Sequence, residues 1–339
     1  MAEQLGAAIN ACGWVATEHA RAYVANAHTR LVGVTSRTRA SAEKLVADLD
    51  LDCRIYADYD ELLSDADVDI VSVTTPNFMH TADAIAAAQA GKHIALEKPA
   101  GINEDELDAL GAAVEAAGVT SVMSFVLRWN ALVLNIKNLI AHGDLGELFF
   151  CQTDYWHGIG DVIRADRWIS RKALAGSAML TGGCHAVDMA RNFCGDIARV
   201  TAFSHDNPSL GFEYDTTTVA TVEFASGAVG RVSACLEIVA PYQFNMVVMG
   251  TEGTASGNDL WSRVLTPHQD DWMNVPCVGP DSGDVAHHPF QEEIDHLVEC
   301  VLDGRDCAPN IADGIRTSRV CLAADRSAAR AGAPEEPNY

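Results

Sequence analysis

Five strand-and-helix repeats fill the first 125 residues of this 339-residue chain, and this alternation is the strongest constraint on its fold. Apolar runs typical of strands lie at residues 4–10, 29–35, 69–73, 92–96 and 121–125, and helix-like segments separate them. A regular alternation of strands and helices is typical of a parallel sheet with helices on both faces. The sequence therefore predicts an α/β protein whose first domain, residues 1–125, is a doubly wound parallel sheet.

The rest of the chain, residues 126–339, is predicted to form a second domain. Strand-like runs lie at residues 148–155, 200–203, 216–224, 230–236 and 244–250. Consecutive strands with links of hairpin length form an antiparallel or mixed sheet. Helices are expected at residues 131–142, 289–302 and 311–329.

The composition excludes several classes of partner. A formal net charge of −24 argues against binding to nucleic acid or to an anionic membrane surface. No apolar run approaches the length of a membrane span, and residues 1–6 lack the basic cluster of a signal peptide. The ten cysteines are scattered without a C-x-x-C pair or a zinc spacing, so we expect free thiols, a cytoplasmic protein and no metal site. The scarcity of lysine fits either a salt-adapted host or a GC-rich genome.

The turn after the first strand has the pattern A-x-G-x-x-A, from Ala11 to Ala16. It departs from the dinucleotide-binding fingerprint G-x-G-x-x-G/A at the first glycine, which Ala11 replaces. Gly13 still lets the backbone approach a pyrophosphate, and Ala16 still permits close packing of helix on strand. The pattern favours a Rossmann dinucleotide-binding domain. The expected cofactor contacts in this turn are Cys12, Gly13, Trp14 and Val15.

The end of the second strand bears on the choice of cofactor. An NAD enzyme would place an acidic residue there, on the ribose 2′-hydroxyl, whereas this chain has Ser36-Arg37-Thr38-Arg39. A hydroxyl followed by guanidinium groups suits a 2′-phosphate, because arginine binds phosphate through a planar fork. We therefore expect contacts from Ser36, Arg37 and Thr38 and a preference for NADP, with NAD possible. The alternative is a basic turn before a helix.

Two further turns follow strands of the predicted sheet. The third-unit strand ends in Thr74-Thr75-Pro76-Asn77 with His80 close behind, and these residues are expected to border the cofactor. The alternative for His80 is a structural residue in the first turn of a helix. The next strand ends at Glu97-Lys98-Pro99, where proline stops the strand and holds Lys98 at the ligand-binding edge of the sheet. Glu97 and Lys98 are expected near the cofactor, the alternative being a surface ion pair.

The motifs that identify a family span nearly the whole chain. They are the A-x-G-x-x-A turn, Thr75-Pro76-Asn77, Glu97-Lys98-Pro99, the glycine-rich helix start that ends in His185, and Phe224-Ala225-Ser226-Gly227. With them the chain resembles the glucose–fructose oxidoreductase/inositol dehydrogenase/rhizopine catabolism (Gfo/Idh/MocA) family. The resemblance implies that residues 126–339 form an α/β domain with a large open, mostly antiparallel sheet, used for substrate binding and oligomerisation. It also implies NAD(P)-dependent chemistry on a sugar, an inositol or a related polyol, in a homodimer or homotetramer.

The resemblance also implies roles for individual residues. The family's catalytic lysine falls on Lys98 and its catalytic histidine on His185. Thr181 stands where family members often have an aspartate, and threonine cannot accept a proton. Asp188, one helical turn after His185, is then either a partner for the imidazole or a carboxylate on the helix surface. The residues expected to bind substrate are Lys98, Arg128, Tyr155, His157, Arg167, Thr181 and His185.

Three functions are compatible with these residues. The first is a dehydrogenase in which His185 takes the hydroxyl proton while Lys98 hydrogen-bonds the same oxygen. The second is an enzyme that retains its cofactor and uses transient oxidation to assist an elimination or a glycoside cleavage. The third is a non-catalytic regulator that binds a sugar or a nucleotide. The sequence favours the first and specifies neither the sugar, nor the carbon, nor the physiological direction.

Overall fold

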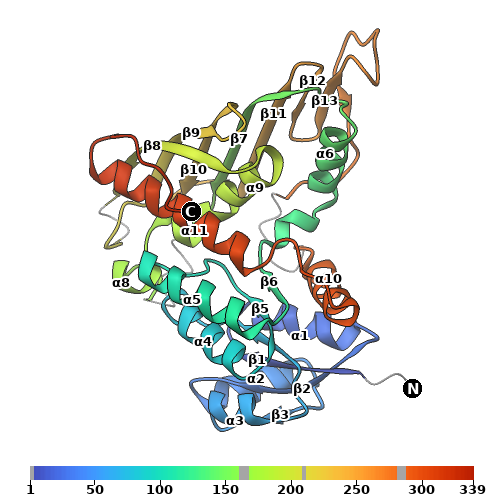
Figure 1. Ribbon diagram of the computed structural model, residues 1–339, viewed down its shortest axis with the longest axis vertical. Helices are drawn as coiled ribbons and strands as arrows, with labels where there is room; N and C mark the ends of the chain where they lie inside the picture. Colours follow the sequence, from blue (N-terminus) through green and yellow to red (C-terminus); the bar gives the residue numbers. More distant parts are fainter. Residues whose placement is uncertain (1–3, 160–167, 208–210, 281–287) are drawn as a thin grey trace. The chain divides into compact units, whose positions relative to one another are not determined.

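The computed structural model describes residues 4–159, 168–207, 211–280 and 288–339. By its internal contacts the chain forms two compact units. The first unit holds residues 1–125 and 289–315, and the second holds residues 126–288 and 316–339. Figure 1 labels the elements along the chain. Among the described residues, no helix is both long enough and apolar enough to cross a membrane.

The first unit contains a six-stranded sheet in the order β3-β2-β1-β4-β5-β6, and every neighbouring pair is parallel. This is the strand order of a Rossmann fold, so the predicted doubly wound parallel sheet is confirmed. The strands are β1 (Leu5–Asn10), β2 (Thr29–Thr35), β3 (Arg54–Ile55), β4 (Ile70–Val73), β5 (His93–Leu96) and β6 (Ser121–Met123). The helices are α1 (Ala16–Ala25), α2 (Arg39–Asp48), α3 (Tyr59–Ser64), α4 (Asn77–Gln89), α5 (Glu104–Ala117) and α10 (Phe290–Asp303).

The central strands of this sheet are buried on both faces. Every residue of β4 is buried, and so is every residue of β5 after His93. Burial on both faces is typical of parallel sheets, which explains why these strands are uninterrupted apolar runs in the sequence. Because the strands are parallel, β1, β4 and β5 all end at the same edge, which is where Rossmann folds bind their ligands.

Helix α10 belongs to the first unit, whereas the sequence-based division placed residues 289–315 in the second domain. The helix packs on α1 through residues that are far apart in the chain. The ring of Phe290 lies 5.4 Å from the ring of His19, and Asn26 donates a hydrogen bond of 2.6 Å to Asp295. The apolar face of α10 is therefore covered by α1, a pairing that no local sequence pattern reveals.

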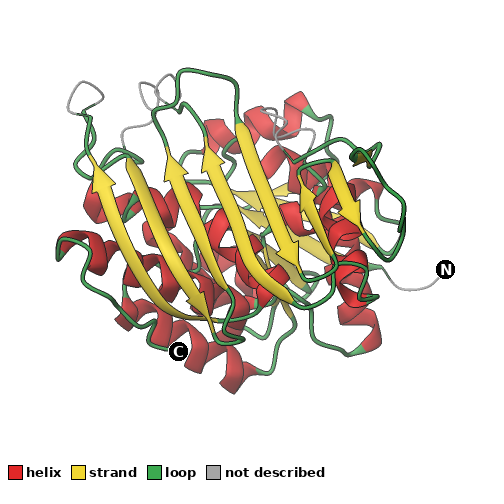
Figure 2. Ribbon diagram, turned by 90° about the horizontal axis from the view of Figure 1, so that it is seen from above, coloured by secondary structure: helices red, strands yellow, loops and turns green. Residues whose placement is uncertain are grey.

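The second unit contains an eight-stranded sheet in the order β14-β13-β12-β11-β7-β10-β9-β8, which Figure 2 shows as one broad layer. Of the described pairs, β7 with β10 is parallel and the others are antiparallel, so the predicted mostly antiparallel sheet is confirmed. The strands are β7 (Leu148–Trp156), β8 (Ile197–His205), β9 (Thr217–Phe224), β10 (Val229–Cys235), β11 (Gln243–Gly250), β12 (Gly253–Ser256), β13 (Asp259–Ser262) and β14 (Met273–Asn274).

Helices cover one face of this sheet. Strand β9 alternates buried and exposed residues along its length, as expected when a sheet is covered on one face only. On the covered face Thr153 of β7 donates a hydrogen bond of 2.7 Å to the carbonyl of Ala186 in α9. The remaining helical segments are η1 (Val126–Trp129), α6 (Ala131–Ala141), α8 (Lys172–Ala175), η2 (Met179–Gly183), α9 (Cys184–Cys194) and α11 (Ile311–Ala329), and the first residues of α11, 311–315, belong to the first unit.

Candidate active site

The predicted cofactor turn follows β1 at the edge where the parallel strands end. Ala11 has a left-handed backbone conformation, with φ 79°, although it has replaced the glycine of the fingerprint. Thr74, at the end of β4, donates hydrogen bonds of 3.0 Å to the carbonyl of Asn10 and 2.8 Å to that of Ala11. Gly13 and Trp14 are exposed. The turn is therefore anchored at its start and open to solvent at its tip.

The next predicted contacts lie at the end of β2. The Cys12 thiol is 3.5 Å from the carbonyl of Thr35, and burial, with a smaller contribution from Cys53, raises the pKa of Cys12 to about 12. Cys12 thus stays a neutral thiol that joins β1 to β2. Arg37 is exposed. Thr38 uses its hydroxyl to cap α2, where it accepts from the Ser41 amide at 3.3 Å.

His80 lies inside the unit, between the ends of two strands. Its Nδ1 is 2.7 Å from the carbonyl oxygen of Pro99, and its Nε2 is 2.6 Å from that of Thr75. The ring therefore links the turn after β4 to the segment that follows Lys98. Burial lowers the pKa of His80, and the two carbonyl hydrogen bonds oppose this shift. Pro76 precedes α4 and Asn77 begins it.

Glu97 and Lys98 are not the surface ion pair that was the alternative for this motif. Glu97 is buried, and it accepts hydrogen bonds from His19 Nε2 at 3.3 Å and from the Ser124 hydroxyl at 3.0 Å. Burial raises the pKa of Glu97, but His19, Lys98 and Ser124 outweigh it and the pKa is lowered overall. Lys98 itself is partly exposed at the carboxyl end of β5. The buried Glu97 carboxylate thus fixes the backbone at Lys98, whose amide donates a hydrogen bond of 3.2 Å to it.

A second buried carboxyl group, Glu293 of α10, lies near Glu97. Burial, together with the charge of Glu97, raises the pKa of Glu293 well above its usual value. The pKa values of two neighbouring buried carboxyl groups are therefore shifted in opposite directions, down at Glu97 and up at Glu293. Glu293 is not among the residues predicted from the sequence. Its position three residues after Phe290 places it on the apolar face of an amphipathic helix, which could have indicated a buried carboxyl group.

In the second unit, His185 lies at the start of α9, directly after the π-helical turn η2. Its ring stacks on that of Tyr155, with centroids 5.8 Å apart and an angle of 18° between the planes. A Cβ at Gly182 would lie 2.4 Å from the Tyr155 ring, so only glycine lets the tyrosine approach this turn. The Tyr155 hydroxyl is 3.1 Å from Nδ1 of His157. Three of the predicted substrate contacts therefore form one cluster.

Tyr242 and His288, which were not predicted from the sequence, complete this cluster. The Tyr242 ring lies 5.3 Å from that of Tyr155 and 4.9 Å from that of His157, and His288 is 6.3 Å from Tyr242. Burial raises the pKa of Tyr155, so its hydroxyl keeps its proton at neutral pH. Tyr242 precedes β11 and His288 lies outside any regular element, so neither belonged to a recognisable motif.

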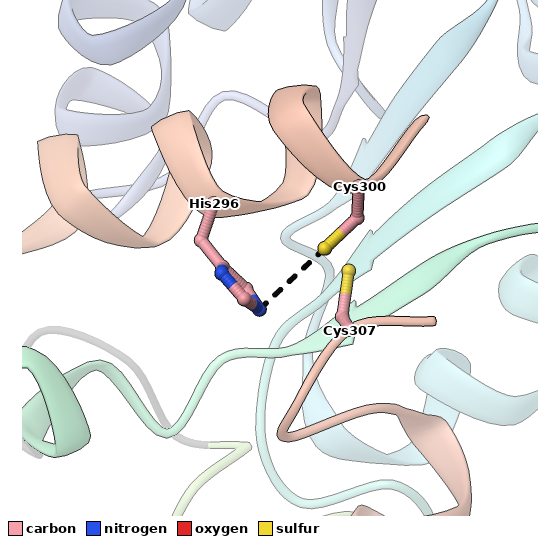
Figure 3. Close-up of side chains that lie close together, drawn as sticks. All are labelled: His296, Cys300 and Cys307. Carbon is pink, nitrogen blue, oxygen red and sulfur yellow. Dashed lines mark hydrogen bonds between the residues drawn. The ribbon is translucent and has the colours of Figure 1, made fainter. Parts of the chain in front are cut away.

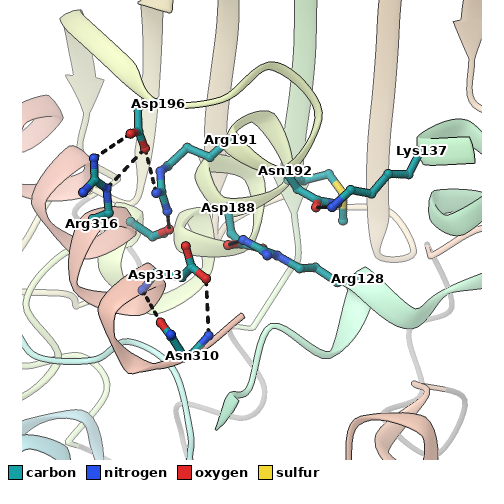
Figure 4. A network of polar contacts seen from close by, with 11 residues as sticks. Arg128, Lys137, Asp188, Arg191, Asn192, Asp196, Asn310, Asp313 and Arg316 are labelled. Carbon is teal, nitrogen blue, oxygen red and sulfur yellow. Dashed lines mark hydrogen bonds and ion pairs between the residues drawn. The ribbon is translucent and has the colours of Figure 1, made fainter. Parts of the chain in front are cut away.

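The other predicted contacts of this unit are differently placed. Arg128 of η1 donates two hydrogen bonds, of 2.8 and 2.6 Å, to the two oxygens of Asp188, and both side chains are largely buried. Figure 4 shows this bidentate pair. Asp188 is thus buried and paired with Arg128, and it is not the surface carboxylate that was one alternative. Thr181 is buried in η2, with its hydroxyl 3.4 Å from the carbonyl of Ala175. Arg167 lies outside the described residues.

Comparison with known proteins identifies the family. A model described as the NAD-binding Rossmann fold of an oxidoreductase family matches residues 6–125, and the GFO/IDH/MocA C-terminal domain matches residues 133–256. The D-xylose 1-dehydrogenase (NADP(+)) 2 of Haloferax volcanii is 30% identical over 68% of this chain and 68% of its own length. The chain belongs to the Gfo/Idh/MocA family. It is therefore an NAD-binding oxidoreductase.

Other members of the Gfo/Idh/MocA family match a larger share of the chain. The levoglucosan dehydrogenase of Pseudarthrobacter phenanthrenivorans is 24% identical over 81% of each sequence. A solved structure of levoglucosan dehydrogenase in complex with NADH superimposes with a TM-score of 0.89, with 99% of each chain covered at 23% identity. This structural likeness establishes that the whole chain has the family fold.

The first unit of this Gfo/Idh/MocA protein fits a nicotinamide dinucleotide at three points. A Cβ at Gly13 would meet no atom within 4 Å, so there is room beside its backbone for a ligand. Helix α1 begins directly after this turn, with no side-chain cap at Val15, and the N-terminal end of a helix favours an anionic pyrophosphate. Arg37 is exposed, whereas Arg39 pairs with Glu43 at 2.9 Å. These features suit the anionic parts of the cofactor.

Proposed function

We propose that this protein transfers a hydride between NADP(H), its preferred cofactor, and a hydroxyl-bearing carbon of a sugar, an inositol or a related polyol. The observation that carries the proposal is the cluster of Tyr155, His157, His185 and Tyr242. Aromatic faces suit the apolar faces of a sugar ring, while imidazole nitrogens and phenol hydroxyls bond its hydroxyl groups. The names of the two curated relatives, which specify D-xylose and levoglucosan, point to the same substrate class.

The proposal gives each catalytic side chain one task. When bound, the nicotinamide accepts or supplies the hydride. His185 serves as the general base that takes the hydroxyl proton, since an imidazole titrates near neutral pH. Lys98 donates a hydrogen bond to the substrate oxygen and stabilises the negative charge that develops there. Glu97 and His80 act as positioning residues, because they fix the backbone on either side of Lys98.

The preference for NADP rests on Ser36 and Arg37 at the end of β2. There the chain offers a hydroxyl and an exposed guanidinium group in place of the acidic residue that would bind a ribose 2′-hydroxyl. Family members differ in this choice: the Haloferax volcanii relative is named for NADP(+), and the levoglucosan dehydrogenase structure contains NADH. The residues of this chain favour the phosphorylated cofactor.

We further propose that the protein is a cytoplasmic homodimer or homotetramer. All ten cysteines are free, as expected in a reducing compartment. On the eight-stranded sheet, Phe203 of β8 and Val219 of β9 are register partners and remain 63% and 44% exposed. An apolar pair on an open sheet face favours pairing with a second copy of the chain.

A substrate screen tests the function. The protein is incubated with NADP⁺ or NAD⁺ and a panel of monosaccharides, inositols and anhydrosugars, and formation of the reduced nicotinamide is followed by its absorbance. We expect turnover with at least one sugar or polyol, and faster turnover with NADP⁺. Substrate consumption without net cofactor reduction would instead identify a redox-assisted lyase or glycosidase. Tight cofactor binding without any turnover would identify a regulator.

A further inference from the structure

We propose that His296, Cys300 and Cys307 form a binding site for a thiophilic metal ion, and that this ion is Zn²⁺. The site lies in the first unit, at the end of α10, and is separate from the residues assigned to catalysis. Figure 3 shows the imidazole and the two thiols converging on one point. One ligand atom from each residue lies within 4.8 Å of the other two. Cys300 and Cys307 are buried, and His296 is partly exposed.

The separations match those of a tetrahedral zinc site. With Zn–S bonds of about 2.3 Å and Zn–N bonds of about 2.0–2.1 Å, neighbouring ligand atoms lie about 3.5–3.8 Å apart. The Cys300 sulfur is already 3.6 Å from His296 Nε2. Even the 4.8 Å limit on the remaining separations exceeds the tetrahedral value by only about 1 Å, which a small side-chain rotation removes.

The fold brings the three ligands together from one helix and the turn that follows it. His296 and Cys300 are four residues apart on α10 and therefore lie on the same face. The helix ends at Gly304, whose left-handed φ of 63° reverses the chain, and the Arg305 amide bonds back to the Cys300 carbonyl at 3.0 Å. This reversal brings Cys307 back beside the face of α10 that carries His296 and Cys300. The spacing H-x3-C-x6-C is not a familiar zinc pattern, which is why the sequence indicated no metal site.

The donor set explains the choice of metal. Two thiolates and one imidazole are ligands that Zn²⁺ prefers over harder cations such as Mg²⁺ or Ca²⁺. Two thiolates also neutralise a divalent ion, so the complex adds no net charge to a buried position. The Ala308 amide donates a hydrogen bond of 3.2 Å to His296 Nε2, and the Cys300 sulfur is 3.6 Å from both that nitrogen and the carbonyl oxygen of Asp306. A metal ion would bind this nitrogen in place of the Ala308 amide and would bind both sulfurs at once, with water in the fourth position.

The expected consequence is structural. The site ties the end of α10 to the loop that follows it, and α10 supplies Glu293 and Phe290, which contact the residues around Glu97. Metal binding should therefore stabilise the first unit by mass action. Because the ligands lie outside the proposed catalytic set, the site can be tested without reference to turnover.

Cobalt(II) is the direct probe, because tetrahedral cobalt–thiolate sites have intense visible and near-ultraviolet absorption. The full-length protein, reduced and freed of metal by a chelator, is titrated with Co²⁺ and then with Zn²⁺. We expect one equivalent of Co²⁺ to bind with a thiolate charge-transfer band, and Zn²⁺ to displace it. Cys300→Ser and Cys307→Ser should abolish the band, and His296→Gln should weaken binding at least about 10-fold. Cys53 is a thiol of the same unit that lies outside the cluster, so Cys53→Ser should change neither the band nor the affinity for Co²⁺.

Thermal unfolding provides a second readout. Zn²⁺ should raise the melting temperature of the parent and of Cys53→Ser by at least about 3 °C. It should not change the melting temperature of Cys300→Ser. The proposal is overturned if the reduced parent protein binds no Co²⁺ at micromolar concentration, or if the cluster variants bind as well as the parent. A Cys300–Cys307 disulfide in protein whose reduced form binds no metal would also overturn it, and would show that the two thiols are a redox pair.

Discussion

Ala11 adopts a left-handed backbone conformation at the end of β1, with φ 79°. For a residue with a Cβ this conformation costs about 1–2 kcal/mol. We predict that Ala11→Gly raises the free energy of unfolding by about 1 kcal/mol, as measured by urea denaturation. Ala22→Gly is the matched control, because the same substitution inside α1 should lower stability by about 1 kcal/mol. Equal losses in both variants would show that Ala11 is not strained.

Arg37 tests the cofactor proposal at the same scale. A guanidinium group that binds the 2′-phosphate should be worth roughly 10- to 150-fold in affinity, the range of a charge-assisted hydrogen bond. We expect Arg37→Ala to weaken NADP(H) binding by this factor and to leave NAD(H) binding nearly unchanged, as measured by titration of nicotinamide fluorescence. Arg39→Ala, which removes the partner of Glu43, is the control. Equal loss for both cofactors in Arg37→Ala would contradict the assignment.

Individual residues were predictable from sequence where a motif fixed their place relative to a strand end. Lys98 follows β5 and Ser36 follows β2, as expected. The partners of these residues were not predictable, because His19, Ser124 and Glu293 reach Glu97 from three different parts of the chain. A sequence pattern records which residues are polar, but only packing decides which of them meet.

At the scale of an element, α10 places the carboxyl group of Glu293 in the core. Its pKa in the folded protein is raised above the unfolded value of about 4.3 by burial and by Glu97. Its contribution to stability is therefore fully present below about pH 4.3 and is lost as the pH rises through the folded pKa. Glu97, with a lowered pKa, contributes in the opposite sense: its stabilisation is lost as the pH falls.

We predict that Glu293→Gln removes the part of the pH dependence of stability that comes from Glu293. The free energy of unfolding of the variant, relative to the parent, should increase between pH 5 and pH 8.5, by at most about 1.4 kcal/mol per pH unit. Urea denaturation at several pH values measures this difference. Glu292→Gln, an exposed neighbour on the same helix, should show a constant difference. Parallel pH profiles for the parent and Glu293→Gln would mean that Glu293 is ionised in the folded protein.

Helices and strands were predicted well from the sequence where one spacing of apolar residues held throughout a segment. The buried strands β4 and β5 were found because strands of a parallel sheet are apolar throughout. The short strands β12 to β14 were not predicted, because segments of two to four residues contain too little periodicity. The assignment of α10 to the first unit also required the structure, since an apolar helix face does not specify which partner covers it.

At the scale of the whole molecule, the open face of the eight-stranded sheet should mediate assembly. We predict that the parent protein is a dimer or tetramer by light scattering at micromolar concentration. Phe203→Asp should lower that mass, because it places a charge within the exposed apolar pair. Val24→Asp, at a 60% exposed apolar position on α1, is the control and should leave the mass unchanged. A monomeric parent would refute the proposed assembly.

The central claim is that Lys98 and His185 serve one reaction. The most direct test is the rate of reduced nicotinamide formation, with the best substrate of the screen, in the parent, Lys98→Ala, His185→Ala and the double variant. We predict that each single substitution lowers kcat at least roughly 100-fold, and that the double variant loses much less than the product of the two factors. Cofactor affinity in His185→Ala should stay within about threefold of the parent value, because that side chain serves the substrate. A near-parental kcat in His185→Ala would contradict the account, and the proton would then have to pass to Lys98 or His157.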